Sequence, residues 1–558
     1  MKTTINKEAT KQILRGVMWS SGIFAAIMGI LLAATLIQTR IHDPINSPAL
    51  QKLIERVEKD PTNESLKEEI RAFDLLARKA FFTSMEQMRF GAVLFIAAIA
   101  IFLLCWKLKE MLFPPLPGVP GEIASWWTQQ TRSRKAVTYG GISIFIMLLL
   151  LGAFTKNRIT PGSESNTEKQ VSDEQVDANW CNFRGPGGNG IARFTNAPTS
   201  WDGAKMTGIK WKTALELPGN SSPVVWEDRI FVTGGSKELR EVYCVNVNTG
   251  KLTWRYVVKV DTDRPIAIPK VSKETGFAAP TVACDGIRVY AIFATGELVA
   301  LTLDGKPVWT RYLGLPENHY GHSSSLITHN GLLFVQYDQN EAGTLYAMNG
   351  ASGKTVWEAK RTLLSWSSPI CVNTGKRYEL ILTDNEFVTS YNPSTGAVLW
   401  SQSCLYGEVG PSAAFSAGRV FAANVNAKAV GIDIAKSDSL GVPPIIWEYE
   451  DGELPNSPSL VAMDSLLFLP SDDGTVTCLN TATGEEYWVE EFETGFYASP
   501  VISGKNVYLM DRNGVMQIIE ASGTYKLVAA PSLGEPAVCT PAILDGFMII
   551  RGEKHLFN

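Results

Sequence analysis

The chain has 558 residues, of which 45% are hydrophobic and 19% are charged, so most of it is expected to fold, although it is too long for one ordinary globular core. The net charge of −5 is divided unevenly: residues 1–155 carry 18 Lys+Arg against 12 Asp+Glu, a net +6, whereas residues 156–558 carry 33 against 44, a net −11. The acidic larger part excludes a nucleic-acid-binding protein, because binding a phosphate backbone needs a basic face.

The first 155 residues contain three apolar stretches that are long enough to cross a bilayer, which takes ~20 helical residues. They cover about residues 17–37, 90–106 and 137–154. Lys and Arg concentrate before the first stretch and between the second and third, and such segments stay on the cytoplasmic side. We therefore predict a multi-pass anchor in a bacterial inner membrane, with residues 156–558 on the periplasmic side.

Two further segments precede the soluble part. Residues 46–88 predict an external helical hairpin, because Asp60 and Pro61 suit a helix start and an apolar stripe follows at helical spacing. That stripe packs either within the anchor or against a second copy of the chain, and both alternatives stay open. Residues 156–179 are polar and contain no aromatic residue, so we predict a flexible linker there.

Residues 180–558 consist of a repeat. Each unit starts with a short Ser, Ala or Thr signal, usually followed by Pro, and contains short β-rich runs separated by turns. Unit starts lie 41 to 57 residues apart, which is typical of a four-stranded propeller blade. There are eight starts but seven complete units, and residues 539–558 hold only three predicted strands. A strand at 208–215 can complete the last blade, so we predict an all-β, eight-bladed β-propeller.

Most units also contain Gly-x-x-x-Trp, with the Gly in the turn before the outer strand and the Trp on that strand. A Trp lies flat only on a residue without a side chain, so we predict that each indole packs on the Gly turn of the neighbouring blade. Leu527 replaces the Trp in the seventh unit, which is expected to form the loosest joint. The predicted docking residues are Trp211, Trp254, Trp309, Trp357, Trp400, Trp447 and Trp488.

These repeats resemble the tryptophan-docking motif of quinoprotein (PQQ-like) propellers. The stretch "WCNFRGPGGNG" at 180–190, followed by Trp201 and "IKWKT", is similar to the entry segment of bacterial PQQ-like propeller proteins. In form the chain resembles the propeller lipoprotein of the outer-membrane assembly machinery, and residues 60–82 resemble a membrane-anchored version of that family. The resemblance covers nearly the whole chain and implies the fold; the fold alone implies no activity.

Catalytic signatures are scarce. Quinoprotein alcohol dehydrogenases resemble one another in a vicinal Cys-Cys pair and a Glu/Asn/Asp calcium site, and this chain has no Cys-Cys pair. We therefore expect neither a PQQ cofactor nor turnover. His319 and His322 form one close His pair without a third ligand at useful spacing, so no metal site is predicted either. The eight Cys are expected to be small buried hydrophobic residues.

A binding surface remains as the best hypothesis. The residue before each unit's small pair should surround the central mouth of the propeller, where it either binds a peptide or ligand or packs beneath loops. We predict a non-catalytic, membrane-tethered scaffold for a protein or peptide partner in the periplasm, in envelope assembly; a sensor or oxidoreductase for a small ligand or quinone is the alternative. The predicted mouth residues are Asn220, Phe277, His322, Trp366, Pro455, Tyr497 and Val538.

Overall fold

The computed structural model describes residues 7–41, 91–112, 171–259, 268–340, 342–436 and 441–558. The chain divides into two compact units, Met1–Gly162 and Ser163–Asn558. The predicted hairpin at 46–88 and the predicted span at 137–154 lie outside the described residues.

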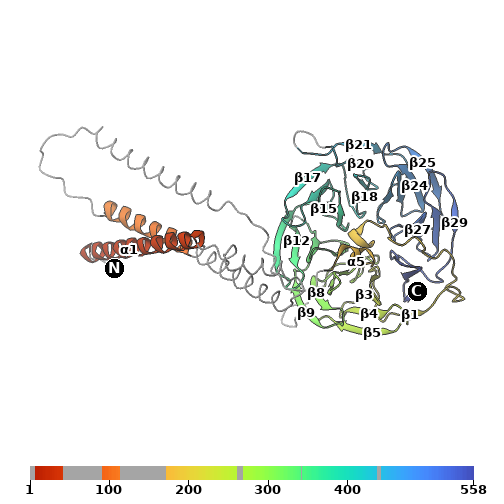
Figure 1. Cartoon of the computed structure of the whole chain (residues 1–558), viewed down its shortest axis with the longest axis horizontal. Coiled ribbons are helices and arrows are strands. Elements are labelled where there is room, and N and C mark those ends of the chain that lie inside the picture. The colour runs from red at the N-terminus through yellow and green to blue at the C-terminus, as the bar shows by residue number, and fades with distance from the viewer. Residues whose placement is uncertain (1–6, 42–90, 113–170, 260–267, 341, 437–440) are drawn as a thin grey trace, which may run out of the picture. The chain divides into compact units, whose positions relative to one another are not determined.

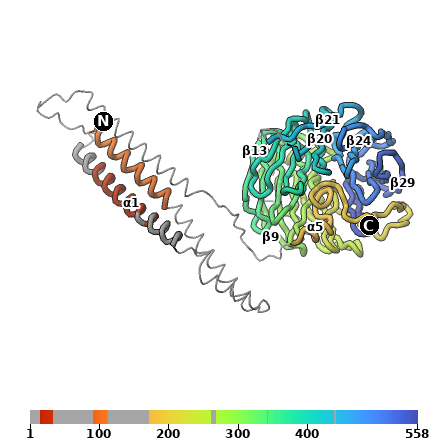
Figure 2. The backbone as a smooth tube through the Cα atoms, turned by 45° about the horizontal axis from the view of Figure 1, so that its top comes forward, coloured from red at the N-terminus to blue at the C-terminus, as the bar shows by residue number. Residues whose placement is uncertain are grey.

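The first unit contains two long helices, α1 (Lys7–Ile41) and the helix Gly91–Leu112, which lie side by side in Figures 1 and 2. Small residues allow their close approach: a Cβ on Gly22 would lie 3.2 Å from the Phe102 ring, and one on Gly29 the same distance from the Phe95 ring. This pairing is typical of helices that associate through small residues.

Within the described residues, the helix Gly91–Leu112 is long and apolar enough to span a membrane, and one such helix is what the structure supports. This differs from the predicted three. Residues 17–37 fall inside α1, where several side chains lie outside the described set, and the third stretch lies wholly outside it.

The second unit is an eight-bladed β-propeller, and Figure 1 looks onto the ring. Every described blade is a four-stranded antiparallel sheet, and in the first seven the strands follow each other in chain order from the centre outward. The first four blades are β2 (Val224–Trp226), β3 (Arg229–Gly235), β4 (Arg240–Asn246) and β5 (Leu252–Val257); β6 (Ala283–Cys284), β7 (Arg288–Ile292), β8 (Glu297–Thr302) and β9 (Pro307–Tyr312); β10 (Ile327–His329), β11 (Leu332–Tyr337), β12 (Gly343–Asn349) and β13 (Thr355–Arg361); and β14 (Ile370–Asn373), β15 (Tyr378–Thr383), β16 (Phe387–Tyr391) and β17 (Val398–Ser403).

The remaining blades continue the same order around the ring. Blades five to seven are β18 (Ala414–Ser416), β19 (Arg419–Ala423), β20 (Ala429–Asp433) and β21 (Ile445–Tyr449); β22 (Val461–Met463), β23 (Leu466–Pro470), β24 (Thr475–Asn480) and β25 (Glu486–Glu491); and β26 (Val501–Ser503), β27 (Asn506–Met510), β28 (Met516–Glu520) and β29 (Leu527–Ala529). The eighth blade consists of β30 (Ala542–Leu544), β31 (Phe547–Arg551), β32 (His555–Phe557) and, as its outer strand, β1 (Lys212–Ala214).

The outer strand of the eighth blade comes from the N-terminal side of the propeller. Strand β1 pairs with β32 in the register Lys212↔Phe557, Thr213↔Leu556 and Ala214↔His555. Figure 1 shows the C-terminus beside β1. The first and last segments of the propeller therefore share one sheet, which leaves no gap in the ring.

Indole rings fasten neighbouring blades. A Cβ added to Gly305 would lie 2.6 Å from Trp254 Cδ2, and the Trp254 indole N–H donates to the Leu303 carbonyl at 2.9 Å. The same Gly-on-indole packing and N–H donation into the next blade occur at Trp211, Trp309, Trp357 and Trp447.

Two of the seven predicted docking residues depart from this pattern. Trp488 donates its N–H to the Ser522 carbonyl of blade seven without a Gly beneath its ring, since Gly523 lies against Tyr487. For Trp400 the docking prediction needs correction: it packs between blades four and five, but its N–H donates to Glu379 of its own blade at 2.8 Å. The reason is that blade five has no Gly-x-x-x-Trp turn to receive it.

This geometry predicts unequal effects of two Gly→Ala substitutions. Gly305 and Gly418 both have left-handed φ, 80° and 75°, but Gly418 has open space where its Cβ would lie. Gly418→Ala should cost about 1–2 kcal/mol for the backbone conformation alone. Gly305→Ala should cost a further ~1–3 kcal/mol because Trp254 must move. Urea unfolding compares the two variants, and equal midpoints would show that the indole does not press on this turn.

Part of the predicted linker is ordered, which corrects its assignment as flexible. Residues 173–177 form the short helix α5 (Asp173–Asp177), with Ser172 and Gln175 in a reciprocal capping box. Val171 and Val176 pack against the core cluster of blades one and two. Residues 171–179 were predicted as part of the linker because the segment is polar overall. Its two capping residues and two valines are too few to change that composition.

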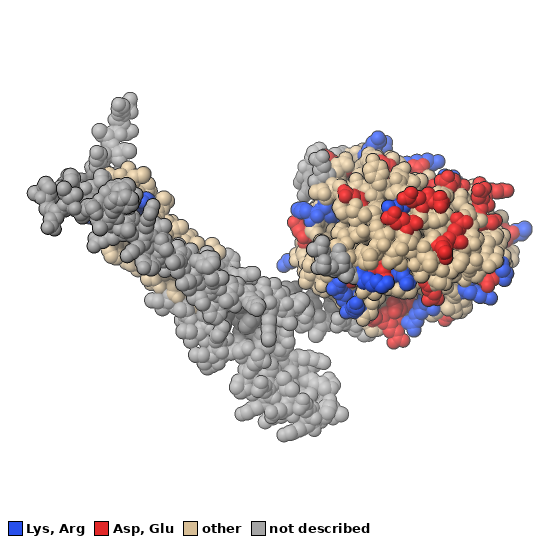
Figure 3. All heavy atoms as spheres, turned by 90° about the horizontal axis from the view of Figure 1, so that it is seen from above, with Lys and Arg blue, Asp and Glu red and all other residues tan. Residues whose placement is uncertain are grey.

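The outer surface of blades five and six is acidic. Exposed carboxylates lie on β21, on β25 and in the turns beside them, and Figure 3 looks onto the part of the propeller that holds these strands. This distribution fits the net −11 of residues 156–558 and disfavours contact with polyanions. The exposed acidic residues are Glu448, Glu450, Asp451, Glu453, Glu485, Glu486, Glu491 and Glu493.

Candidate functional site

Residues 180–192 close one end of the central channel of the propeller. Trp180 bridges to Val225 of blade one, Asn189 exchanges hydrogen bonds with Phe415 of blade five, and Ile502 N–H of blade seven donates to the Gly190 carbonyl at 2.8 Å. We call this segment the plug. Gly187 in it has φ 65°, and a Cβ there would lie 2.7 Å from the Cys371 carbonyl oxygen, so the plug fits tightly against blade four as well.

Above the plug, the channel is lined by a closed ring of hydroxyl groups, one from each blade. In each case the backbone N–H of one ring residue donates to the hydroxyl oxygen of the next blade's ring residue, at 2.8–3.1 Å, and the last blade returns to the first. All eight side chains are buried. The members of this hydroxyl ring are Ser222, Thr281, Ser325, Ser368, Ser412, Ser459, Ser499 and Thr540.

The channel between plug and mouth is a well of about 370 Å³. Phe183 of the plug and the hydroxyl ring line its lower part. Its rim carries Tyr320, Trp366 and Tyr497 together with the carboxylates Glu274 and Glu408. A well of this size with aromatic and polar walls is suited to binding a ligand or a short peptide segment.

A cluster of aromatic residues and one carboxylate at the rim joins three connections between blades. The Tyr320 and Trp366 ring centroids lie 5.2 Å apart, and the His319 ring meets Trp366 edge-on at 5.0 Å. Glu408 accepts the Tyr320 hydroxyl at 2.9 Å and contacts His319 Nε2 at 2.8 Å, and this carboxylate raises the pKa of Tyr320. The cluster is held in place although its side chains are accessible from the mouth.

A polar network beneath the rim fixes Trp366. The Trp366 N–H donates to the Val409 carbonyl, and its indole N–H donates to Asn318 Oδ1 at 2.8 Å. Its neighbours in the chain, Ser365 and Ser367, share a hydrogen bond, and Ser367 donates to the Thr383 carbonyl.

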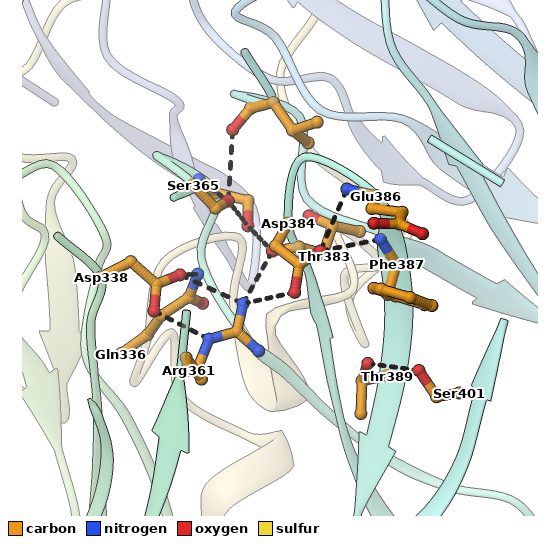
Figure 4. A network of polar contacts seen from close by, with 12 residues as sticks. Gln336, Asp338, Arg361, Ser365, Thr383, Asp384, Glu386, Phe387, Thr389 and Ser401 are labelled. Atoms are coloured by element: carbon orange, nitrogen blue, oxygen red, sulfur yellow. Dashed lines mark hydrogen bonds and ion pairs between the residues drawn. The ribbon is translucent and has the colours of Figure 1, made fainter. Parts of the chain in front are cut away.

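That carbonyl also belongs to a buried ion-pair network, which Figure 4 shows. Arg361 Nε lies 2.7 Å from Asp338 Oδ1, and Nη2 lies 3.1 Å from Oδ2 and 3.3 Å from an oxygen of Asp384. Burial alone would lower the pKa of Arg361, but the Asp338 carboxylate raises it above its ordinary value. The guanidinium therefore joins blades three and four as a permanent cation.

The predicted mouth residues divide into two groups. Asn220, Trp366, Tyr497 and Val538 line the well, whereas Phe277, His322 and Pro455 do not. His322 is buried, and its ring lies 4.9 Å from that of Tyr337.

Sequence reasoning missed Tyr320, Glu408 and Glu274, which lie in the connections between blades, where no repeated motif distinguishes them. Asn456 begins a unit-start signal, but it was not predicted to line the well.

The buried His322 is expected to make the folded protein less stable as the pH falls. Burial lowers its pKa to about 4 from 6.5, so the folded state binds fewer protons than the unfolded state between these values. Its contribution to stability is therefore full above pH 6.5 and falls as the pH drops toward 4, by about 3 kcal/mol in total. His322→Phe should remove this loss while packing against Tyr337. Unfolding free energies measured from pH 7.5 to 4 should diverge between wild type and variant; parallel curves would contradict the assignment.

The described residues offer no arrangement of three or more His, Cys, Asp or Glu suited to a metal ion. His319 is exposed at the rim and His322 is buried, so the two do not converge. All eight cysteines are free and buried, and burial raises the pKa of Cys181, Cys371 and Cys478 to about 12, which makes them poor nucleophiles. The site is therefore equipped for binding by stacking and hydrogen bonding.

Comparison with known proteins gives matches over the propeller. A family model described as outer membrane protein assembly factor BamB matches residues 202–365, 241–459 and 384–526. Relatives of that name from Salmonella typhimurium (strain LT2) and Escherichia coli (strain K12) are each 24% identical over 291 residues, covering 48% of this chain and 71% of the relative.

Two solved structures are similar to part of the chain. BamB from Moraxella catarrhalis is 16% identical with a TM-score of 0.47, and the match covers 63% of this chain and 97% of that one. Quinohemoprotein alcohol dehydrogenase from Comamonas testosteroni is 12% identical with a TM-score of 0.49, covering 70% and 82%.

Proposed function

Because the chain belongs to the family of the outer membrane protein assembly factor BamB, we propose that it is a non-catalytic propeller scaffold that binds a protein partner during outer-membrane protein assembly. One observation carries the proposal: the mouth of the well is open and aromatic while its opposite end is closed by the plug. Aromatic residues supported by a rigid frame are typical of the energetically dominant centre of protein interfaces. The rim around Tyr320, Trp366 and Tyr497 is therefore our candidate partner surface.

Cross-linking at single positions tests this surface. A photo-reactive amino acid in place of Trp366 or Tyr497 should give cross-linked protein adducts in intact cells. The matched control replaces Val356, an exposed apolar residue on the outer strand β13, far along the blade from the channel. Adducts from Val356 but none from the two rim positions would reject the rim as the partner surface.

We further propose that residues 1–155 tether the propeller to the inner membrane through three helices, with the propeller in the periplasm. The helix Gly91–Leu112 and the concentration of Lys and Arg in 107–135 support this topology. A reporter enzyme active only in the periplasm should be active when fused after residue 170 and silent when fused after residue 120. The reverse pattern would place the propeller in the cytoplasm.

The absence of a Cys-Cys pair supports a propeller that works without a quinone cofactor. Absorbance spectra of the purified full chain distinguish the two classes of function. We expect no quinone band, and a stoichiometric band that disappears on denaturation and dialysis would favour the small-ligand or oxidoreductase alternative.

A further inference from the structure

The hydroxyl ring presents eight hydrogen-bond donors toward the well. Each ring oxygen accepts one backbone N–H, but within the described part of the chain no acceptor receives any of the eight hydroxyl protons. The eight side chains are at most 7% exposed, and all of them line the well. Because these hydroxyls line the well, their protons are available to whatever occupies it, so a ligand that accepts several of them at once is favoured there.

Two buried guanidinium groups lie beside the ring on opposite sides. Arg184 of the plug donates to the carbonyls of Ala413, at 3.2 Å, and Leu460, the residues that follow ring members Ser412 and Ser459. Across the ring, Arg551 of β31 donates to the hydroxyl of Ser221 at 2.6 Å, next to ring member Ser222.

Neither cation has a carboxylate partner among the residues that the structure describes, and the Nε of each lacks an acceptor. Burial lowers the pKa of Arg184 to about 9, and burial likewise lowers that of Arg551, as expected for cations that no anion compensates. Both guanidinium groups therefore remain protonated at neutral pH. Neither lines the well, so each adds positive potential to it from behind its wall.

The carboxylates of the well lie at its rim and do not cancel the positive potential from the two guanidinium groups. Glu274 and Glu408 are exposed, and Glu408 already contacts His319 and Tyr320. Solvent screens charges at the surface, whereas the two buried guanidinium groups act through a medium of lower dielectric constant. The base of the well therefore favours an anion over a cation. Hydroxyl groups alone would not discriminate, because they donate to anions and coordinate cations through their oxygens.

We propose that the base of the well binds a carboxylate, and that the C-terminus of a polypeptide chain supplies it. A carboxylate accepts several hydrogen bonds at once and forms its strongest ones near cationic donors. The well of about 370 Å³ extends beyond the space that a small carboxylate fills, and Trp366 and Tyr497 face the residues that would follow. This inference rests on the proposed function, because it names the part of the partner that enters the mouth.

The test uses the full chain in detergent and three probes: N-acetyl-trialanine with a free carboxylate, the same peptide as its carboxamide, and acetate. Binding is followed by ligand-observed NMR. We expect the carboxylate peptide to bind at least tenfold more tightly than the carboxamide, and acetate to displace it only in large excess. Equal binding of the two peptides, or no binding of the first, overturns the proposal. Displacement by equimolar acetate overturns the peptide as the source of the carboxylate.

Variants of the protein test whether the carboxylate binds at the hydroxyl ring. Ser412→Ala/Ser459→Ala removes two donors beside Arg184 and should weaken binding of the carboxylate peptide at least tenfold; Arg184→Met should do the same. Ser323→Ala is the matched control, because Ser323 also lines the well but already donates its proton to the Trp366 carbonyl. Unchanged affinity in the double variant overturns the site. If Arg184→Met fails to fold because the plug is disturbed, the affinity of the Ser412→Ala/Ser459→Ala variant alone tests the site.

The two proposals fail separately. Rim cross-links to a partner without any preference for a carboxylate probe would leave the scaffold function standing and overturn this inference. A preference for the carboxylate probe without rim cross-links would leave the carboxylate site standing and overturn the rim as the partner surface.

Discussion

Arg361→Met is expected to destabilise the propeller by about 3–5 kcal/mol, the range for removing one partner of a buried ion pair. The substitution leaves Asp338 and Asp384 buried without their cation, and both are nine-tenths or more buried. It also removes the hydrogen bond to the Thr383 carbonyl, which connects blades three and four. Guanidinium-chloride unfolding of the full chain at pH 7 measures the effect.

Lys526→Met supplies the control for this substitution. Lys526 and Glu520 form an ion pair at 2.7 Å on the surface of blade seven, with the Lys526 side chain 68% exposed. Exposed pairs contribute between about 0 and 1 kcal/mol, because water screens them and ordering two side chains costs entropy. If Arg361→Met costs no more than Lys526→Met, the buried network does not stabilise the blade contact.

The network also connects stability to the candidate surface. Arg361 and Ser367 donate to the same Thr383 carbonyl, and Ser367 follows Trp366 directly. Variants of Arg361 that still fold should therefore give weaker rim cross-links, because Trp366 loses part of its support.

The repeat made the propeller predictable from the sequence. Gly-x-x-x-Trp specifies a turn and an outer strand locally, and its regular return predicts equivalent blades without any long-range information. The three-stranded C-terminal unit and Trp211 predicted a closing strand, and the structure pairs β1 with β32. Six of the eight residues of the hydroxyl ring lie in the signals at the unit starts, and Thr281 and Ser459 follow directly after their signals. Their hydrogen bonds run between blades, so they form only in the closed ring.

The rim was harder to predict because it is built from connections of unequal length. The residue before each small pair was assigned to the mouth by analogy between units, and this analogy fails where a connection turns differently. Trp366 and Tyr497 reach the well, whereas His322 is buried against Tyr337. The rim position of that unit is taken instead by Tyr320, which lies two residues before His322. Glu408 contacts Tyr320 across 88 positions of sequence, a pairing for which no local pattern exists.

Removal of residues 180–215 is expected to abolish cooperative unfolding and to leave an aggregating chain, whereas removal of residues 1–170 should leave a soluble, monodisperse propeller. The first deletion removes β1 and the plug together, which opens the eighth blade and exposes strand edges on either side of the gap. Size-exclusion chromatography and thermal unfolding compare the two fragments. A monodisperse fragment 216–558 that melts cooperatively would show that the ring closes without β1.

A pair of proline substitutions separates the closing strand from the plug. Trp211 and Asn558 exchange backbone hydrogen bonds, and Leu215 N–H donates to the Lys554 carbonyl, so in an antiparallel ladder Thr213 N–H must point at β32. Neighbouring Ala214 then directs its N–H away from the sheet.

Thr213→Pro should break the β1–β32 ladder, cost about 2–3 kcal/mol and promote association, since two or more hydrogen bonds of ~1 kcal/mol are lost. Ala214→Pro should cost much less, because an outer strand tolerates proline where its N–H faces solvent. Unfolding and light scattering distinguish the two, and equal behaviour would mean that the hydrogen bonds of β1 do not hold the ring closed.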